Sequence, residues 1–316
     1  MNGFERKMGG LRMMAASDLH YLSPQLMEYR GTFREMCEAI GEPEMERIEA
    51  VADELLETVR REKPDVFLIT GDLSYQGEKL SHVQLAGKLA GLVRAGIHVY
   101  VVPGNQDMEN PFSMCWRPGT EGDGRVPFPV ESVSAGEFKK IYHDMGYNEN
   151  DKNIVSRAPD SLSYQVHLTK PDADIFMLDT TISMSPKGEI LPGTLAWLEE
   201  RLGKRNEKGL GKRQVPCIIA GHHPMLPLNE SGYTLENSEE LCRLMWKYQV
   251  PFYISGHLHQ SGTAAAPEPG NRLKQLGRLV RRLTGTGRNC ITPINIFLEK
   301  RKCVAVQSQI SMIGKE

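Results

Sequence analysis

Apolar runs alternate with amphipathic segments along the first third of the chain. Three of these runs end in polar residues and predict buried strands: LRMMAASD (11–18), DVFLITGD (65–72) and IHVYVVPGN (97–105). Between them, residues 44–62 and 79–95 place apolar side chains at helical spacing, and Pro64 ends the first of these two helices. Strands that alternate with helices predict a layered α/β core.

The same alternation returns after residue 162. Four more segments predict strands: SYQVHL (163–168), ADIFMLDT (173–180), VPCIIAGHH (215–223) and VPFYISGHLH (250–259). Residues 193–206 and 236–248 predict helices between them. Residues 108–162 interrupt this alternation of strands and helices. They are rich in Gly, Pro and charged residues, and they predict only one short helix, at 135–145. A long insertion beside a site often forms a lid or a wall of the substrate pocket, and the alternative is a simple surface excursion.

The tail of the chain differs in character from the rest. In residues 263–288, leucines recur at helical spacing beside several arginines, which predicts a basic amphipathic helix. Such a helix can bind a membrane surface or a partner, but we expect it to pack on its own domain with a solvated basic face. Residues 290–309 predict a terminal hairpin. We therefore divide the chain into a main domain, 1–262, with the insertion 108–162, and a C-terminal extension, 263–316, packed on the same domain.

Composition and charge exclude some classes of protein. The net charge of −2 gives no overall attraction to nucleic acid or to anionic membranes. No apolar run reaches the roughly 18 residues of a membrane-spanning helix, and the first residues lack the apolar segment of a secretion signal. The six cysteines form no CxxC pair, which indicates reduced thiols in a cytoplasmic protein.

Five strand ends carry polar clusters of one kind. They are SDLH (17–20), GDLS (71–74), GNQD (104–107), GHHP (221–224) and GHLH (256–259). Such ends can converge on one edge of an α/β sheet. The candidate ligands are then Asp18, His20, Asp72, Asn105, His222, His223, His257 and His259.

Imidazole nitrogens with carboxylate oxygens suit the borderline divalent metals, so Mn, Fe, Co, Ni and Zn are the candidates. No cysteine joins the set, which argues against a structural zinc–thiolate site. The set is larger than one ion of four to six coordination would take. Two ions are therefore predicted, and Asp72, which has no neighbouring ligand in the sequence, is the natural bridge.

The ordered motifs D-x-H, G-D, G-N-x-D, G-H and G-H-x-H, from Asp18 to His259, resemble those of the calcineurin-like metallophosphoesterase superfamily. The resemblance implies a four-layer fold, with two β-sheets packed face to face and helices outside. It also implies that one metal is held by Asp18, His20 and His259, and the other by Asn105, His222 and His257, with Asp72 bridging. His222 is preferred to His223 because the family's H-x-P spacing places the ligand two residues before Pro224. His223 would then lie near the substrate or behind the ligands. The stretches SDLHYLS and TLENSEEL (234–241) are similar to those of bacterial members.

The sequence departs from the family at Gln106, where a histidine is usual. In the family that histidine assists the leaving oxygen, and the next acidic residue, here Asp107, orients it. An amide can donate a hydrogen bond but does not titrate near neutral pH, so we expect a slowed enzyme and not an inactive one.

The resulting hypothesis is a phosphomonoesterase or phosphodiesterase in which a hydroxide shared by two metal ions attacks phosphorus. Its substrate would be a small phosphate ester. Two alternatives remain open at this point. In the first, the replacement of histidine by Gln106 indicates a metal-binding protein that has lost its catalytic activity and acts by recognition. In the second, the protein is a nuclease, as some superfamily members are, although the near-neutral charge disfavours a nucleic-acid substrate here.

Overall fold

The computed structural model describes residues 11–118, 126–183, 185–209, 215–226 and 235–259, together with three short strands at 262–265, 292–295 and 304–307. The helices are α1 (Gly31–Ile40), α2 (Ile48–Glu62), α3 (Lys79–Arg94), α4 (Ala135–Ile141), α5 (Pro192–Gly209) and α6 (Ser238–Lys247), with 3₁₀ turns η2 (Pro43–Arg47) and η3 (His143–Met145). The strands are β1 (Arg12–Ala16), β2 (Val66–Thr70), β3 (His98–Val102), β4 (Met114–Cys115), β5 (Phe128–Pro129), β6 (Ile154–Arg157), β7 (Tyr164–Thr169), β8 (Asp172–Leu178), β9 (Cys217–Gly221), β10 (Phe252–Ser255), β11 (Gly262–Ala265), β12 (Thr292–Asn295) and β13 (Val304–Gln307).

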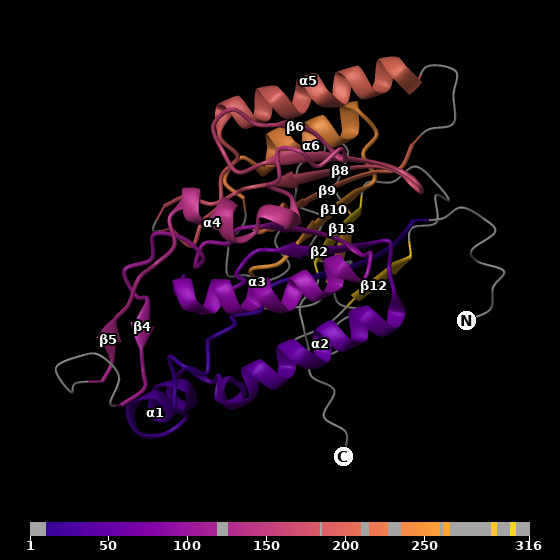
Figure 1. The fold of residues 1–316 in the computed structure, drawn as a ribbon. Helices are drawn as coiled ribbons and strands as arrows, with labels where there is room; N and C mark the ends of the chain where they lie inside the picture. The colour runs from indigo at the N-terminus through magenta and orange to yellow at the C-terminus, as the bar shows by residue number, and fades with distance from the viewer. Residues whose placement is uncertain are drawn as a thin grey trace.

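The first sheet has the strand order β12-β1-β2-β3. Strands β1, β2 and β3 are parallel, and α2 and α3 form the crossovers between them. These two helices pack on each other and cover the outer face of this sheet (Figure 1). The buried side of α2 consists of Val51, Leu55 and Val59, the apolar positions that the sequence places at helical spacing. All three predicted strands therefore end at one edge of the sheet.

The second sheet has the order β11-β13-β10-β9-β8-β7-β6. Its strand β8 is buried on both faces, and successive side chains alternate between two cores. Ile175 and Met177 join the core shared with the first sheet, whereas Phe176 and Leu178 join the core under α5 and α6. The order is thus helices, sheet, sheet, helices (Figure 1), which confirms the predicted α/β four-layer fold.

The segment 108–162 contains more structure than its composition predicts. The short helix expected at 135–145 is present as α4 followed by η3. The β4–β5 hairpin and the edge strand β6 were not predicted, because each is short and interrupted by turn residues. Helix α1 was also missed; it buries Phe33 and Cys37 in a third, smaller core. The role of residues 108–162 as a lid or a wall of a substrate pocket stays a prediction.

One prediction for the tail lies outside the described residues and another is wrong. The leucines that predict a helix within 263–288 all lie in residues 266–288, outside the described part, and before them Gly262–Ala265 is strand β11. The predicted hairpin at 290–309 contains two strands that do not pair with each other. Instead β12 pairs with β1 of the first sheet, and β13 lies between β11 and β10 of the second. Alternating side chains predict a strand but not its partner. The division of the chain at residue 262 stays a prediction.

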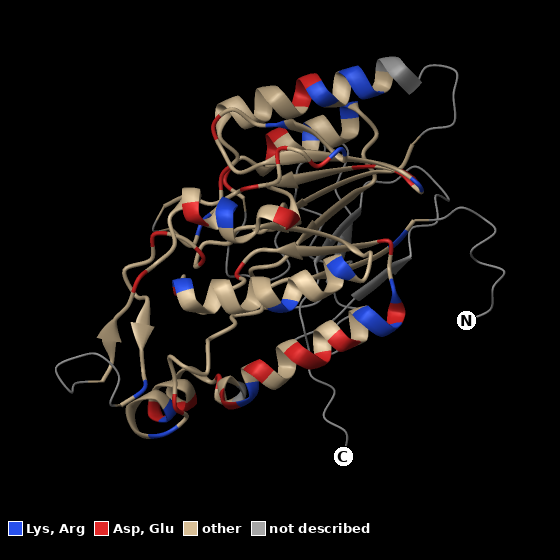
Figure 2. Cartoon of the chain, viewed as in Figure 1, with Lys and Arg blue, Asp and Glu red and all other residues tan. Residues whose placement is uncertain are grey.

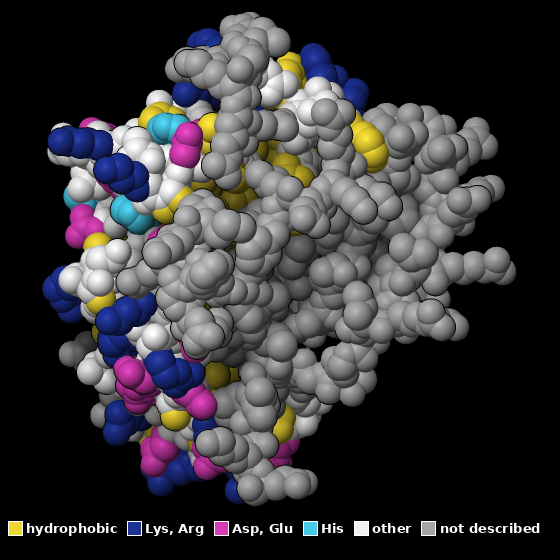
Figure 3. Space-filling model, turned by 90° about the vertical axis from the view of Figure 1, so that its right-hand side faces the viewer, with side chains coloured by type: hydrophobic (Ala, Val, Ile, Leu, Met, Phe, Trp, Pro, Cys, Tyr) yellow, Lys and Arg dark blue, Asp and Glu magenta, His cyan; other side chains and the backbone are white. Residues whose placement is uncertain are grey.

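Charge is mixed over the described surface. Figure 2 shows acidic and basic side chains interspersed along α2 and α5, and Figure 3 shows both signs among the described side chains of its face. No helix in the described residues is long and apolar enough to cross a bilayer. The cytoplasmic location stays a prediction.

Glu78 is a buried acid directly before α3, and it makes stability depend on pH. Its Oε2 accepts the N–H of Gln76 at 3.2 Å, while its Oε1 has no partner among the described residues. Burial raises the pKa of Glu78 from 4.5 to about 7, although the N–H donor and Ser81 oppose this. Because the folded-state pKa is above the unfolded one, folding takes up a proton in this window. Stability is therefore lost as pH rises from 4.5 to 7, by up to about 3 kcal/mol.

Glu78→Gln should remove this component. In urea titrations of metal-free protein, we expect the variant to gain stability relative to the wild type between pH 5 and pH 8. A stability difference that is the same at both pH values would contradict the assignment.

Candidate metal centre

The polar strand ends come together at the edge where the two sheets meet. Asp18, Asp72 and Asn105 follow β1, β2 and β3 of the first sheet, and His222 and His257 follow β9 and β10 of the second. Backbone hydrogen bonds join the loops: Asp18 N donates to the carbonyl of Gly71 at 3.0 Å, and Gly256 N donates to the carbonyl of His222 at 2.9 Å. The parallel order of the strands therefore places ligands that are distant in sequence side by side.

One group of candidate ligands consists of Asp18, His20 and His259, whose ligand atoms lie within 4.8 Å of one another. The Nε2 atoms of His20 and His259 are 3.0 Å apart, and His259 Nε2 is 3.6 Å from Asp18 Oδ1. The backbone N–H of His257 donates to both carboxylate oxygens of Asp18, at 3.0 and 2.9 Å, and so fixes this carboxylate.

A second group surrounds the Nε2 atom of His222. This atom lies 3.1 Å from Asn105 Oδ1, 3.4 Å from Asp72 Oδ2 and 3.3 Å from His257 Nδ1. On the other side of the ring, Nδ1 is 2.8 Å from the carbonyl oxygen of Thr70. A carbonyl can only accept, so Nδ1 carries a proton, and when the ring is neutral the lone pair is on Nε2, which faces the other ligands. Metal-ligating histidines usually donate their other ring N–H to a carbonyl or carboxylate in this way.

The donor atoms fit a metal better than they fit one another. Two imidazole nitrogens at 3.0 Å share at most one hydrogen bond, whereas both lone pairs could bind one cation. Burial alone would raise the pKa of Asp72, but His222 and His20 hold that pKa well below its usual range. Burial would lower the pKa of His222, yet Asp72 raises it to about 9. Buried carboxylates and imidazoles crowded in this way are the donor set that borderline divalent metals prefer.

The backbone at this edge is unusual. Five candidate ligands have a positive φ: Asp18, His20, Asp72, His257 and His259. Such a conformation costs a non-glycine residue of the order of 1 kcal/mol or more and persists where the surroundings impose it.

Two glycines of the motifs allow neighbouring loops to approach each other closely. A Cβ on Gly104 would lie 2.2 Å from Asp72 Oδ1, and one on Gly256 would lie 1.7 Å from Ser17 Oγ and 2.4 Å from Asp18 Oδ2.

Gly256→Ala should therefore separate the loop that carries His257 and His259 from the loop that carries Asp18. We expect weaker metal binding and a stability loss of about 1–3 kcal/mol, as for other overpacked sites. Gly87→Ala is the matched control, because nothing lies within 4 Å of the added methyl group. Metal titration and thermal unfolding measure both effects, and wild-type metal affinity in Gly256→Ala would refute the close-approach argument.

The three residues predicted to assist the site have distinct surroundings. Gln106 N donates to Asp72 Oδ1 at 3.0 Å, and the side-chain Oε1 of Gln106 is buried with no partner in the described part of the chain. The carboxylate of Asp107 accepts the backbone N–H groups of Leu73, Ser74 and Gly104 at 3.1, 2.9 and 2.8 Å. Asp107 therefore ties the loop after β2 to the loop after β3.

His223 is fully buried beside the ligands, with ring centroids 4.9 Å from His222 and 4.6 Å from His257. Its Nδ1 is 2.8 Å from Thr180 Oγ1, and its Nε2 has no partner within the described residues. A ring nitrogen of His223 also lies within 4.8 Å of ligand atoms of His222 and His257. The structure thus places His223 next to the second group. The predicted position of His223 near the substrate or behind the ligands stays a prediction.

The predicted site residues do not include one polar residue of this region. His82 is fully buried and forms hydrogen bonds with Ser74 and Asp107. No motif indicates this role, because His82 lies on the helix α3 and not at a strand end.

Comparison with known proteins shows the family of the chain. Residues 11–261 match the calcineurin-like phosphoesterase family. The chain is 24% identical over 203 residues to the glycerophosphodiester phosphodiesterase GpdQ of Enterobacter lignolyticus (strain SCF1), covering 63% of this chain and 57% of that protein. It is 26% identical over 148 residues to the tartrate-resistant acid phosphatase type 5 of Oryctolagus cuniculus, covering 42% and 43%. The matches thus span only about half the length of these relatives.

A solved structure shares the fold. A dimetal phosphatase from Danio rerio superimposes with a TM-score of 0.52 and 14% sequence identity, covering 81% of this chain and 84% of that one. The family match covers most of the chain, and the fold and the order of the candidate ligands agree with it. The chain belongs to the calcineurin-like phosphoesterase family, whose members are metal-dependent phosphoesterases.

Proposed function

We propose that the protein is a dinuclear metal-dependent hydrolase of phosphoric esters. The observation that carries the proposal is the convergence of two groups of lone-pair donors on one sheet edge, with Asp72 between them. Asp72 Oδ2 faces His222, and the charge of Asp72 also acts on His20 of the other group. These two interactions support Asp72 as the proposed bridge between the groups.

In this proposal Asp18, His20 and His259 hold one ion, Asn105, His222 and His257 hold the other, and Asp72 bridges them. The candidate ions are Mn, Fe, Zn, Co and Ni, in divalent or trivalent form. When bound, two such ions would activate water as the nucleophile and neutralise the charge of the phosphate group.

The protein's own groups have separate tasks in this proposal. The Thr70 carbonyl holds His222 in the tautomer that presents Nε2, and the N–H of His257 holds the Asp18 carboxylate. Gln106 lies beside Asp72 and can donate an amide hydrogen bond to a leaving oxygen without giving up a proton. Asp107 holds the loops that carry Asp72 and Asn105 at a fixed separation.

The substrate proposed is a small phosphate ester, either a monoester or a diester. The names of the two relatives include both a phosphodiesterase and a phosphatase, so both ester types stay in the proposal. The mixed charge of the described surface gives no support to a nucleic-acid substrate (Figure 2).

Turnover of an aryl phosphate and of a bis-aryl phosphate diester, with added Mn and with a chelator, tests the proposal. We expect metal-dependent release of the phenol from at least one ester. Tight metal binding without turnover of either ester would instead favour a homologue that acts by recognition.

A further inference from the structure

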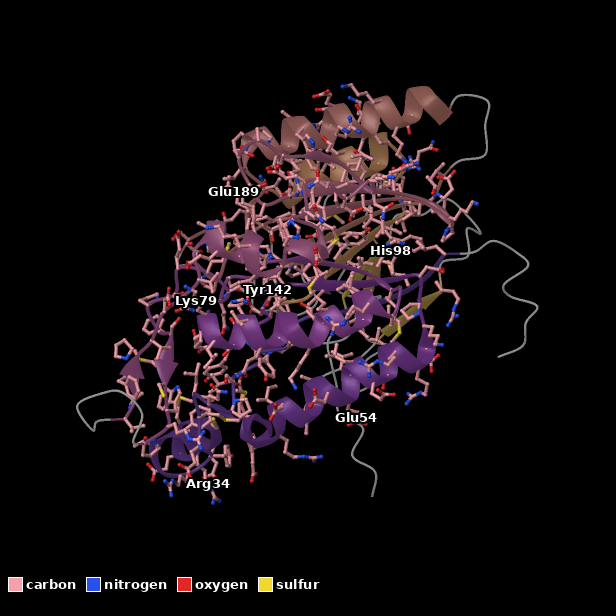
Figure 4. The ribbon with its side chains drawn as sticks, in the orientation of Figure 1. Arg34, Glu54, Lys79, His98, Tyr142 and Glu189 are labelled. Carbon is pink, nitrogen blue, oxygen red and sulfur yellow. The ribbon has the colours of Figure 1, made fainter. Side chains whose placement is uncertain are left out.

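A chain of buried polar side chains connects the insertion 108–162 to the loops of the metal centre. It consists of Tyr142, His82, Ser74 and Asp107, each fully buried. Tyr142 directly follows α4, His82 lies on α3, and Ser74 and Asp107 lie in the loops after β2 and β3. Figure 4 labels Tyr142 in the region between α4 and α3. These four residues thus come from four segments of the sequence that no motif connects.

The donor and acceptor of each hydrogen bond that His82 makes in this series of buried side chains can be assigned. His82 Nε2 is 2.9 Å from the carbonyl oxygen of Asp107, which can only accept, so Nε2 carries the proton. The same nitrogen is 2.8 Å from Ser74 Oγ. In the neutral ring Nδ1 is then the acceptor, and the Tyr142 hydroxyl donates to it at 2.9 Å. Burial lowers the pKa of His82 to about 4, so the ring is neutral at pH 7.

The far end of the chain reaches the ligand loops. The Ser74 hydroxyl lies 3.2 Å from Asp107 Oδ1, to which it donates, and it accepts the N–H of Gly77 at 2.9 Å. The Asp107 carboxylate in turn accepts the N–H of Leu73, next to Asp72, and the N–H of Gly104, next to Asn105. Ser74 and Asp107 therefore connect the loops that carry the candidate ligands Asp72 and Asn105.

The insertion also holds the ring of His82 by packing. Phe138 of α4 and Tyr142 contact the ring in edge-on geometry, each with ring centroids 5.7 Å away. Glu137 of α4 forms an ion pair at 2.8 Å with Lys79 of α3, which Figure 4 labels. Helix α4 is thus fixed over the segment of α3 that carries His82.

We infer that His82 and Tyr142 are positioning residues of the metal centre. Tyr142 fixes the ring of His82, and His82 fixes the backbone at Asp107 and the hydroxyl of Ser74, which together set the distance between Asp72 and Asn105. The inference rests on the proposed function, since it takes Asp72 and Asn105 as ligands. It gives the insertion a role in metal binding, in addition to any role beside the substrate.

Tyr142→Phe tests the inference, with Tyr164→Phe as its matched control. Both tyrosines are fully buried, and each hydroxyl donates one short hydrogen bond: Tyr142 to His82, and Tyr164 to the carbonyl of Val101 at 2.8 Å. Both variants should lose similar stability. Only Tyr142→Phe should weaken Mn binding, by about tenfold, because outer partners of metal ligands typically contribute about 10- to 100-fold in affinity.

His82 provides a second pair of variants. His82→Leu leaves the Asp107 carbonyl and the Tyr142 hydroxyl without partners, and we expect Mn affinity to fall by about 100-fold. His82→Gln keeps an N–H donor near the position of Nε2 and should recover most of that loss. If His82→Leu does not fold, the two tyrosine variants decide the question alone.

The measurement is Mn titration of the metal-free full-length chain by calorimetry, with thermal unfolding recorded in parallel. Wild-type Mn affinity in Tyr142→Phe, or equal losses in Tyr142→Phe and Tyr164→Phe, would overturn the positioning role and leave the proposed function intact. A wild-type chain that binds none of Mn, Fe, Zn, Co or Ni would overturn both.

Discussion

Asp72→Asn is expected to lower the metal content of the protein and to reduce turnover by several orders of magnitude. The carboxylate is buried between the two groups of ligands, and both proposed ions share its charge. The amide that replaces it has one acceptor oxygen instead of two and no charge, so it cannot bridge two cations equally well. Asn can still accept the N–H of Gln106, as Asp72 Oδ1 does now, so the loop should keep its conformation.

Asp174→Asn is the matched control for the loss of a buried carboxylate. Asp174 pairs with Arg205 at 3.0 Å on β8, and it belongs to neither ligand group. This control should lose stability but keep its metal content and turnover. Metal analysis and kinetics on both variants decide the matter. Two tightly bound ions with full turnover in Asp72→Asn would end the bridging assignment.

Gln106→His is expected to increase the hydrolysis of alkyl phosphates more than that of aryl phosphates. General acid assistance is typically worth about 10²–10⁴ in rate, and esters with poor leaving groups need it most. The backbone at this position is held independently of the side chain, because Gln106 N donates to Asp72 and its carbonyl accepts from Asn110 at 3.2 Å. A histidine can therefore replace the amide without moving Asn105, and it adds a group that titrates near neutral pH.

Gln106→Met separates the acid effect from simple packing, because it fills similar space without polar atoms. It should give no gain on either ester. The rates are compared on an alkyl and an aryl phosphate at several pH values, with metal content measured for each variant. If Gln106→His shows no gain on either ester while its metals stay bound, the amide is not a missing acid, and the natural substrate does not need one.

The sequence alone predicted the strands that carry the candidate ligands. The runs before Asp18, Asp72 and Asn105 are apolar on both faces, so they predict buried strands whose ends can converge on one edge. The chemistry of the site was also predictable, since histidine and carboxylate follow these runs in a fixed order. Periodicity and motif order are local properties, and local properties can be read from one sequence.

Only the tertiary structure decided the contacts between distant segments. The sequence predicts strands at 290–309, but their partners depend on which sheet edge is free, and so β12 joins β1 while β13 joins β10. The tautomer of His222 follows from the Thr70 carbonyl, 152 residues away along the chain. His82 gave no signal in the sequence, because its role depends on Tyr142 and Asp107, which the packing of α3 and α4 brings to it. Hydrogen-bond partners of this kind are set by three-dimensional packing, and the spacing of residues along the chain does not contain them.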